Sequence, residues 1–299
     1  MDSQRTRQEE EIAVRGVALI TAGALVLVVA SVLGPAALAG KPKVEEEGGG
    51  ISRLDLIGVN FIENCRFSHQ APDDPIVFPG KPGASHQHTF VGNRTTNAFS
   101  DHGSLRAGST TCVRPEDTAA YWVPTLYQGT NPVFPQGATI YYRRGTLAEV
   151  SPFPNNLRMI AGDAAATSPQ GMRGTFWSCG VASGVDRSAT VPTCPNIRGS
   201  FLRLHIRFPE CWNGRSLDSA DHKSHMAYAM RAGCPSTHPV EVPQITQIYR
   251  YPTQGGDGFS LASGGQYSAH ADFVNAWKPN VLRSLVDDCL NGLVHCGRG

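Results

Sequence analysis

Eight cysteines and the segment that precedes them constrain the fold of this 299-residue chain more than any other feature. Arg5, Arg7 and Arg15 stand before an uncharged apolar run over residues 16–40, and all eight cysteines follow that run. A basic stretch before an apolar run stays in the cytoplasm, and the chain after the run is exported. Because disulfides form in oxidising compartments, the sequence predicts an extracellular part with up to four disulfides.

The apolar run fits two kinds of segment. It is longer than the roughly 20 residues that span a bilayer, and it ends in Ala37-Leu38-Ala39, the small-x-small pattern of a signal-peptidase site. We therefore expect a cytoplasmic basic stub over residues 1–15, a transmembrane anchor or signal peptide over 16–40, a flexible linker over 41–50 and a single extracellular domain over 51–299. The protein is then membrane-anchored through its N-terminal segment with an extracellular domain, or it is secreted.

The spacing of the cysteines favours pairs between near neighbours in the chain. We expect the disulfides Cys179–Cys194, Cys211–Cys234 and Cys289–Cys296, which leaves Cys65 for Cys112. The sequence contains no Cys-x-x-Cys pair, which argues against a zinc–thiolate site and against a redox-active dithiol.

The pattern of apolar residues and chain breakers predicts a mainly β protein. The 32 glycines and 21 prolines break the chain into short segments, and strands are expected over residues 51–61, 121–127, 138–143, 201–208 and 245–251. Only residues 281–290 repeat apolar side chains at helical spacing, with Pro279 suited to the first turn and Gly292 to the C-cap. We therefore expect a β-sandwich or jelly-roll-like core with long disulfide-pinned loops and a C-terminal helix.

The polar face of the strand over residues 201–208 has two interpretations. Arg203, His205 and Arg207 alternate with apolar residues and share one face. They either floor a groove for an anionic or sugar-like ligand or form a solvated sheet face. A net charge of +1 and the absence of a basic run exclude nucleic acid as an expected partner.

Clustered histidines and aspartates give the main indication of a functional site. Residues 218–225 read Asp-Ser-Ala-Asp-His-Lys-Ser-His. If this octet is helical, Asp218, Asp221, His222 and His225 lie on one side, where they can ligate a metal or hold each other in position. The alternative is a polar loop in which the aspartates cap a short helix and the histidines face solvent.

Two further motifs strengthen the functional interpretation. His86 and His88 are two residues apart, so both point the same way in extended chain, and His270 is followed two residues later by Asp272. We expect these motifs to meet in one pocket, with His86, His88, His222 and His225 as metal ligands. Asp218, Asp221, Asp272 and His270 are the expected catalytic residues.

The expected cofactor is one divalent metal ion, zinc or copper, which would activate water for hydrolysis. A metal-free enzyme is the alternative, either a glycosidase with two carboxyl groups drawn from Asp74, Asp218, Asp221 and Asp272, or a lyase with a histidine base.

A long ordered set of motifs resembles one known family. It runs from Asp74-Pro75-Ile76-Val77-Phe78-Pro79-Gly80 through His86-Gln87-His88-Thr89-Phe90, Cys211-Trp212-Asn213-Gly214 and Asp221-His222-Lys223-Ser224-His225 to His270-Ala271-Asp272-Phe273. It is similar to the domain-of-unknown-function family nineteen-ninety-six of secreted actinobacterial and fungal proteins. Asn213 stands where the family usually has Asp, and Val91 where an aromatic is common. In fungi the domain often accompanies carbohydrate-binding modules, which implies polysaccharide as a partner.

The sequence therefore supports two expectations for function. The first is a hydrolase or lyase that acts on cell-surface polysaccharide or cell-wall glycan through the His/Asp site. The alternative is a non-catalytic carbohydrate- or wall-binding module in which the histidines are structural and Tyr121, Trp122, Trp177 and Trp212 stack on sugars. Convergence of the His and Asp side chains in one cleft would distinguish the two.

Overall fold

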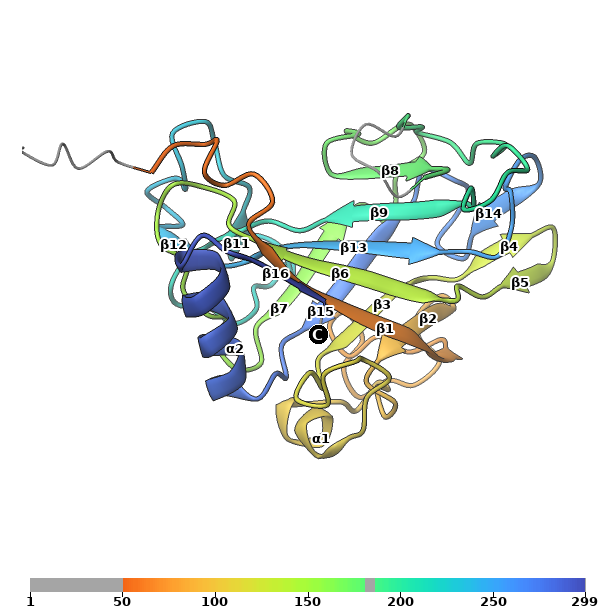
Figure 1. Ribbon diagram of the computed structural model, residues 1–299. Helices are drawn as coiled ribbons and strands as arrows, with labels where there is room; N and C mark the ends of the chain where they lie inside the picture. Colours follow the sequence, from red (N-terminus) through yellow and green to blue (C-terminus); the bar gives the residue numbers. More distant parts are fainter. Residues whose placement is uncertain (1–50, 181–185, 299) are drawn as a thin grey trace, which may run out of the picture. The chain divides into compact units, whose positions relative to one another are not determined.

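A ten-stranded sheet forms the body of the protein, and its neighbouring strands are antiparallel except for the last strand, β16 (His295–Arg298), which runs parallel to β1. The sheet is nearly barrel-shaped, and the strands β1, β6, β13 and β9 lie side by side across Figure 1. The order is β7 (Arg158–Gly162), β15 (His270–Val274), β3 (Ala120–Pro124), β2 (His88–Gly92), β1 (Asn60–Ala71), β6 (Gly137–Arg143), β13 (Gln244–Arg250), β9 (Arg203–Arg207), β8 (Thr175–Ser178).

Smaller elements complete the fold. Two three-stranded sheets have the orders β11 (Met226–Ala227), β10 (Cys211–Trp212), β12 (Val240–Glu241) and β14 (Phe259–Leu261), β4 (Leu126–Gln128), β5 (Asn131–Val133). Within residues 51–180 and 186–298 the helices are α1 (His102–Ala107), α2 (Pro279–Leu285) and the π-helix η1 (Val286–Asn291).

The computed structural model describes residues 51–180 and 186–298, which belong to one compact unit over 49–299. The expected basic stub, the anchor or signal peptide over 16–40 and the linker lie outside the described residues. Within the described part, none of the helices is long and apolar enough to cross a membrane.

Strand β1 joins the two halves of the large sheet. Its first part pairs with β6, where Asn60 lies opposite Arg143, and its second part pairs with β2, where Ala71 lies opposite His88. A register irregularity between Phe67 and His69 accompanies the change of partner. Such an irregularity increases the bend and twist of a strand, which helps the sheet to curl around its core.

The main core lies inside the curled sheet and contains a buried chain of hydrogen bonds. Trp277 Nε1 donates to the Tyr142 hydroxyl at 3.0 Å, Tyr142 and Tyr121 share a hydroxyl–hydroxyl bond, and the Tyr121 hydroxyl donates to Asp117 at 2.8 Å. All four side chains are fully buried. A polar chain of this kind stabilises a core only while every member keeps its partner.

Replacing Tyr142 with Phe is expected to lower the free energy of unfolding by about 1–3 kcal/mol, because Trp277 Nε1 loses its acceptor in a buried site. Tyr141→Phe is the matched control, since Tyr141 is the neighbouring residue on β6 but lies on the opposite, more exposed face. Chemical denaturation of both variants measures the difference. Equal effects of the two substitutions would contradict a stabilising role for the buried hydroxyl.

The structure confirms the mainly β fold, the four disulfides and the C-terminal helix. Cys65–Cys112, Cys179–Cys194, Cys211–Cys234 and Cys289–Cys296 are all paired as the spacing predicted. The expected opening strand over residues 51–61 is wrong for most of its length. Residues 53–58 form turns, and strand β1 begins at Asn60.

A loop over residues 72–87 covers β2, β3 and β15 on the side away from the main core. A second apolar cluster lies there and includes Ile76 from the loop, Phe90 from β2, Trp122 from β3 and Val274 from β15. These side chains are almost completely buried. The loop is therefore packed on the sheet by its own apolar residues, and it carries polar residues to fixed positions beside the strands.

Candidate metal centre

Neighbouring strands bring His88, His270 and Asp272 to one place. Asp272 on β15 lies opposite Trp122 on β3, and Trp122 lies opposite Phe90 on β2. His270 lies two residues before Asp272 on β15, and His88 lies two residues before Phe90 on β2. Both histidines therefore face the same side of the sheet at the same level. The ring centroids of His88 and His270 are 5.8 Å apart.

The covering loop adds His86 and Asp74 to these strand residues. The His86 ring centroid lies 4.2 Å from that of His88 and 5.0 Å from that of His270. One nitrogen from each of the three histidines lies within 4.8 Å of the other two. In a second group, one oxygen of Asp74, one oxygen of Asp272 and one nitrogen of His88 also lie within 4.8 Å of one another. We call these five residues the His/Asp cluster.

Backbone carbonyls fix the tautomers of two of the histidines. His88 Nδ1 donates to the carbonyl of Asp73 at 3.0 Å, and His270 Nδ1 donates to the carbonyl of Ser268 at 2.9 Å. Both rings therefore present the lone pair of Nε2 to the cluster. A ring held by its Nδ1–H is the usual arrangement for a histidine that binds a metal through Nε2.

Buried polar atoms in the cluster lack partners. Among the described residues, no hydrogen bond reaches His86 Nε2, His88 Nε2 or either carboxylate oxygen of Asp272. Asp272 is only 1% exposed. An unpaired buried polar group costs about 1–3 kcal/mol, so several at one point require an explanation, and an ion held by the histidine nitrogens is one.

The electrostatics favour uncharged side chains in the absence of a cation. Burial lowers the pKa of His86, lowers that of His88 strongly and lowers that of His270 to about 4. Burial, followed by the nearby charge of Asp74, raises the pKa of Asp272 well above its usual value. The neutral imidazole is the form that binds metals, and a bound cation would favour ionised Asp272.

Asp74 is positioned by its own loop. Its Oδ1 accepts hydrogen bonds from the backbone N–H groups of Ile76 at 2.8 Å and Val77 at 2.9 Å. This leaves Oδ2 free of those bonds. Burial nevertheless raises the pKa of Asp74.

The His/Asp cluster opens into a cavity of about 370 Å³. His86, His270, Asp74 and Asp272 line it together with part of the octet, namely Asp221, His222 and Lys223. The predicted convergence of the His and Asp motifs in one pocket therefore has a counterpart in the structure, but the octet contributes the rim rather than the centre.

The octet itself is not helical, and its residues have different positions from those expected. Residues 218–225 form turns and bends, and His222 has a positive φ of 58°. The Asp221 carboxylate accepts from the backbone N–H groups of Lys223 and Ser224 and from two serine hydroxyls. These bonds lower the pKa of Asp221, and they hold the loop in a turn that competes with helix formation.

Neither His225 nor Asp218 belongs to the His/Asp cluster. His225 is buried, with Nδ1 bonded to Ser219 at 2.9 Å and Nε2 to the carbonyl of Arg158 at 2.6 Å. Both ring nitrogens are therefore engaged, which corrects the expectation that His225 is a ligand. Asp218 bonds to His222 Nδ1 at 3.0 Å and orients that ring at the rim of the cavity.

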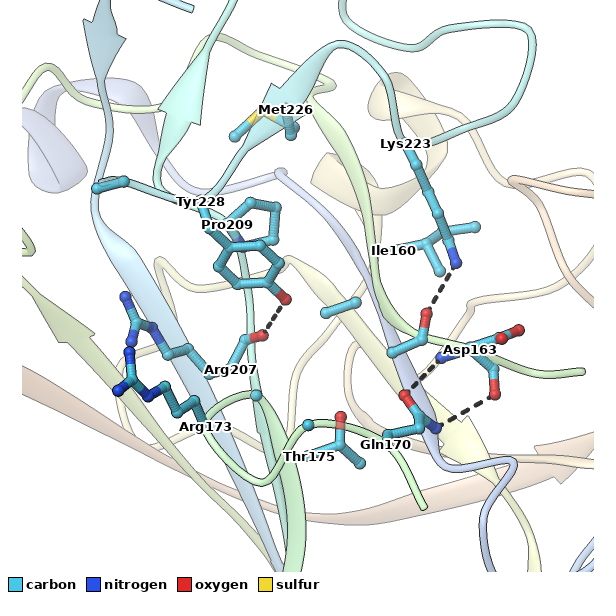
Figure 2. A pocket seen from close by; sticks show the side chains of 15 residues that line it. Ile160, Asp163, Gln170, Arg173, Thr175, Arg207, Pro209, Lys223, Met226 and Tyr228 are labelled. Carbon is cyan, nitrogen blue, oxygen red and sulfur yellow. Dashed lines mark hydrogen bonds between the residues drawn. The ribbon is translucent and has the colours of Figure 1, made fainter. Parts of the chain in front are cut away.

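A larger cavity of about 580 Å³ adjoins the first, because Ile160, Asp163 and Lys223 line both. Figure 2 shows Arg173 and Arg207 on one side of this cavity and Asp163 and Lys223 on the other. Lys223 Nζ donates to the carbonyl of Gly162 at 2.7 Å. The larger cavity thus offers polar and charged groups to a molecule that reaches the His/Asp cluster.

The aromatic residues expected on a sugar-binding platform are mostly in the core. Tyr121, Trp122 and Trp177 are completely or almost completely buried. Trp212 is half-buried, and its Nε1 donates to the carbonyl of Ser216 at 2.7 Å. These four residues do not form an exposed platform.

From the sequence, His270 is expected among the catalytic residues, whereas Lys223 is named as part of the octet without a role. The pairing of β15 with β3, which brings His270 beside His88, has no local signal in the sequence. Asp74 was considered only as a glycosidase carboxylate. Its position two residues before a buried Ile76 was the available signal, since Asp side chains commonly bond to backbone N–H groups two residues ahead.

The comparisons with known proteins give one match. The family model described as Domain of unknown function (DUF1996) matches residues 74–277, a range that contains all five members of the His/Asp cluster. No curated protein and no solved structure matches the chain significantly.

Proposed function

The chain belongs to the family described as Domain of unknown function (DUF1996), whose match covers residues 74–277, and we propose that this member is a metal-dependent hydrolase of the cell exterior. The resemblance expected from the ordered motifs is thereby confirmed. The family description names no activity, so the proposal is based on the geometry of the His/Asp cluster.

The observation that carries the proposal is the convergence of three neutral imidazoles and a buried, unpartnered carboxylate. His86, His88 and His270 would hold the ion, and three histidines with an open position form a known catalytic zinc arrangement. Imidazole ligands also suit copper. Zinc is the better match for hydrolysis, since it lowers the pKa of bound water and polarises the bond to be broken.

The protein's own residues have distinct roles in this proposal. Asp272 Oδ2 lies 3.9 Å from His270 Nε2, where it would accept the proton of the attacking water. The water oxygen forms a bond to the electrophilic carbon, the bond from that carbon to the leaving atom breaks, and the leaving atom takes up the proton that Asp272 had accepted, which restores the carboxylate. Lys223, which lines both cavities, would stabilise negative charge that develops in the transition state.

The proposed substrate is an extracellular polysaccharide such as cell-wall glycan. The four disulfides suggest an extracellular or secreted protein. The two adjoining cavities supply space beside the cluster for several groups of a polymer. The segment over 16–40, which lies outside the described residues, would keep this domain at the membrane if it is retained and release it if it is cleaved.

The test is hydrolysis of a panel of cell-wall and plant polysaccharides by the zinc-loaded protein, with released reducing ends and released acyl groups as the readouts. We expect Asp272→Asn to lower the rate by about 100-fold or more, in line with the contribution of a general base. Asp287→Asn is the control, because Asp287 is an exposed acid on η1 outside the cavities. If the zinc-loaded protein retains a polymer without breaking a bond in it, the non-catalytic binding module replaces the hydrolase.

A further inference from the structure

Another part of the large sheet carries a separate cavity of about 460 Å³, formed by β1, β6, β13 and β9 on the side away from the core. Its lining includes Arg66, Arg203 and Arg250 together with His205 and Tyr141. None of these residues belongs to the His/Asp cluster. We propose that this cavity binds an acidic oligosaccharide through its arginines.

The register of the sheet places the three lining arginines in one row. Arg66 on β1 lies opposite Gly137 on β6, Gly137 lies opposite Arg250 on β13, and Arg250 lies opposite Arg203 on β9. Residues opposite one another in a sheet point to the same face, and like charges in that position destabilise the pair. Gly137 has no side chain and lines the cavity between Arg66 and Arg250.

The arginines of this face are not neutralised by acidic residues. Arg143 and Arg207 lie on the same face at the other ends of β6 and β9, and Arg187 lies over Phe176 on β8. Of these three arginines and the three in the row, only Arg207 has a carboxylate partner among the described residues, Glu210 at 2.7 Å. Arg203 is 3% exposed, and its Nη1 is buried without a hydrogen-bond partner. A buried guanidinium with free N–H groups at the wall of a cavity is a donor that an oxyanion can satisfy.

The positive potential of this face also acts on His205. Burial, followed by the charges of Arg203, Arg187 and Arg143, lowers the pKa of His205 to about 3. The neutral ring bonds to Ser178 Oγ at 2.8 Å and stacks on Phe176. His205 therefore adds no charge of its own, and the field of the face comes from the guanidinium groups.

The uncharged groups of the cavity favour a sugar over a nucleic acid. Proteins that bind single-stranded nucleic acids combine a basic groove with aromatic faces on which the bases stack. Here Arg143 lies 4.2 Å from the centre of the Tyr141 ring and Arg187 lies 4.6 Å from that of Phe176, so cations already cover these rings. The remaining lining offers amides and hydroxyls at Asn64, Gln136 and Thr139. Guanidiniums interspersed with such groups match a ligand that alternates carboxylate or sulfate groups with hydroxyl groups.

The test is calorimetric titration of the protein with hexagalacturonate and with a heparin-derived hexasaccharide at low salt. We expect at least one of them to bind, with an affinity that falls as salt is added, whereas a neutral hexasaccharide does not bind. Arg250→Gln and Arg66→Gln should each weaken binding by about tenfold, the effect of one charge-assisted hydrogen bond. Both arginines are exposed, so these variants leave the packing intact. Arg283→Gln on α2 is the control with the same change of charge.

Several outcomes would overturn the assignment. They are failure of both acidic hexasaccharides to bind, equal affinity of Arg250→Gln and the parent protein, and tighter binding of a single-stranded DNA hexamer. The assignment does not depend on the proposed hydrolase, because the row of arginines is separate from the His/Asp cluster. His88→Ala is expected to leave hexasaccharide binding unchanged, so the failure of one proposal can be told from the failure of the other.

Discussion

Replacing His88 with Ala is expected to abolish metal binding by this protein. His88 is completely buried, and it is the residue shared by the two groups of candidate ligands, one with His86 and His270 and the other with Asp74 and Asp272. Removal of its Nε2 therefore takes a donor from either arrangement of ligands. Elemental analysis should show close to one zinc or copper ion per chain in the parent protein after reconstitution and only background metal in the variant.

The effect should also appear in stability. A ligand that binds only the folded protein raises the free energy of unfolding by about 4 kcal/mol at a thousand times its Kd. For a domain of this size that corresponds to a rise in Tm of roughly 8–16 °C. All eight cysteines are in disulfides, so the unfolded, oxidised chain offers no thiolate to compete for zinc.

The quantity to compare is the rise in Tm that added metal produces in each protein. His88→Ala leaves a cavity and is expected to lower the Tm even without metal, so the Tm alone does not report on the metal. His86→Ala, at a half-buried position of the same cluster, should lose this rise with a smaller cost to the fold. His295→Ala is the control, because His295 is exposed and bonds to the carbonyl of Gly58. A parent protein that takes up neither zinc nor copper would rule out the metal centre.

Local patterns predicted the individual strands, and pairing between distant segments decided the site. The expected strands over residues 138–143 and 245–251 correspond within one residue to β6 and β13, because both segments are rich in the β-branched and aromatic residues that favour strands. The expected strand over 51–61 failed because its apolar residues precede β1 in a series of turns. Apolar and polar residues alternate over residues 53–58, but this segment pairs with no other strand in the described part of the chain.

The octet shows why motif density alone does not locate a site. It holds two aspartates and two histidines, yet Asp221 and His225 are engaged by local partners and the backbone. The sparse motifs, His86-x-His88 and His270-x-Asp272, form the centre instead, since alternate residues on neighbouring strands share a face. The order β15-β3-β2, which places those faces together, depends on long-range pairing that no local pattern reveals.

The polar strand face over residues 201–208 illustrates the same limit. Its alternation correctly separated Leu204 and Ile206, which are in the core, from Arg203 and His205. It did not show that Arg203 and His205 are also buried; the Phe176 ring on the neighbouring strand stacks on His205, and Arg250 lies opposite Arg203. The interpretation as a solvated face therefore fails at these two residues, and the interpretation as the floor of a groove agrees with the cavity there.

Removal of the Cys65–Cys112 disulfide is expected to lower the free energy of unfolding more than removal of Cys289–Cys296. The two bridges close loops with sequence separations of 47 and 7 residues. The loss of loop-closure entropy in the unfolded chain corresponds to about 4 kcal/mol for the longer loop and about 2.5 kcal/mol for the shorter one. Cys65 lies on β1 and Cys112 lies in the connection between α1 and β3, so the longer bridge also holds that connection against the central strand.

The comparison uses the double variants Cys65→Ala/Cys112→Ala and Cys289→Ala/Cys296→Ala, since alanine avoids a buried hydroxyl at positions that belong to or pack on the core. Urea denaturation followed by tryptophan fluorescence gives both free energies against the parent protein. If the chain-entropy account holds, the first variant is the less stable of the two by about 1.5 kcal/mol or more. An equal or greater loss in the second variant would contradict it, and would mean that the C-terminal bridge stabilises the fold by holding η1 and β16 together rather than by restricting the unfolded chain.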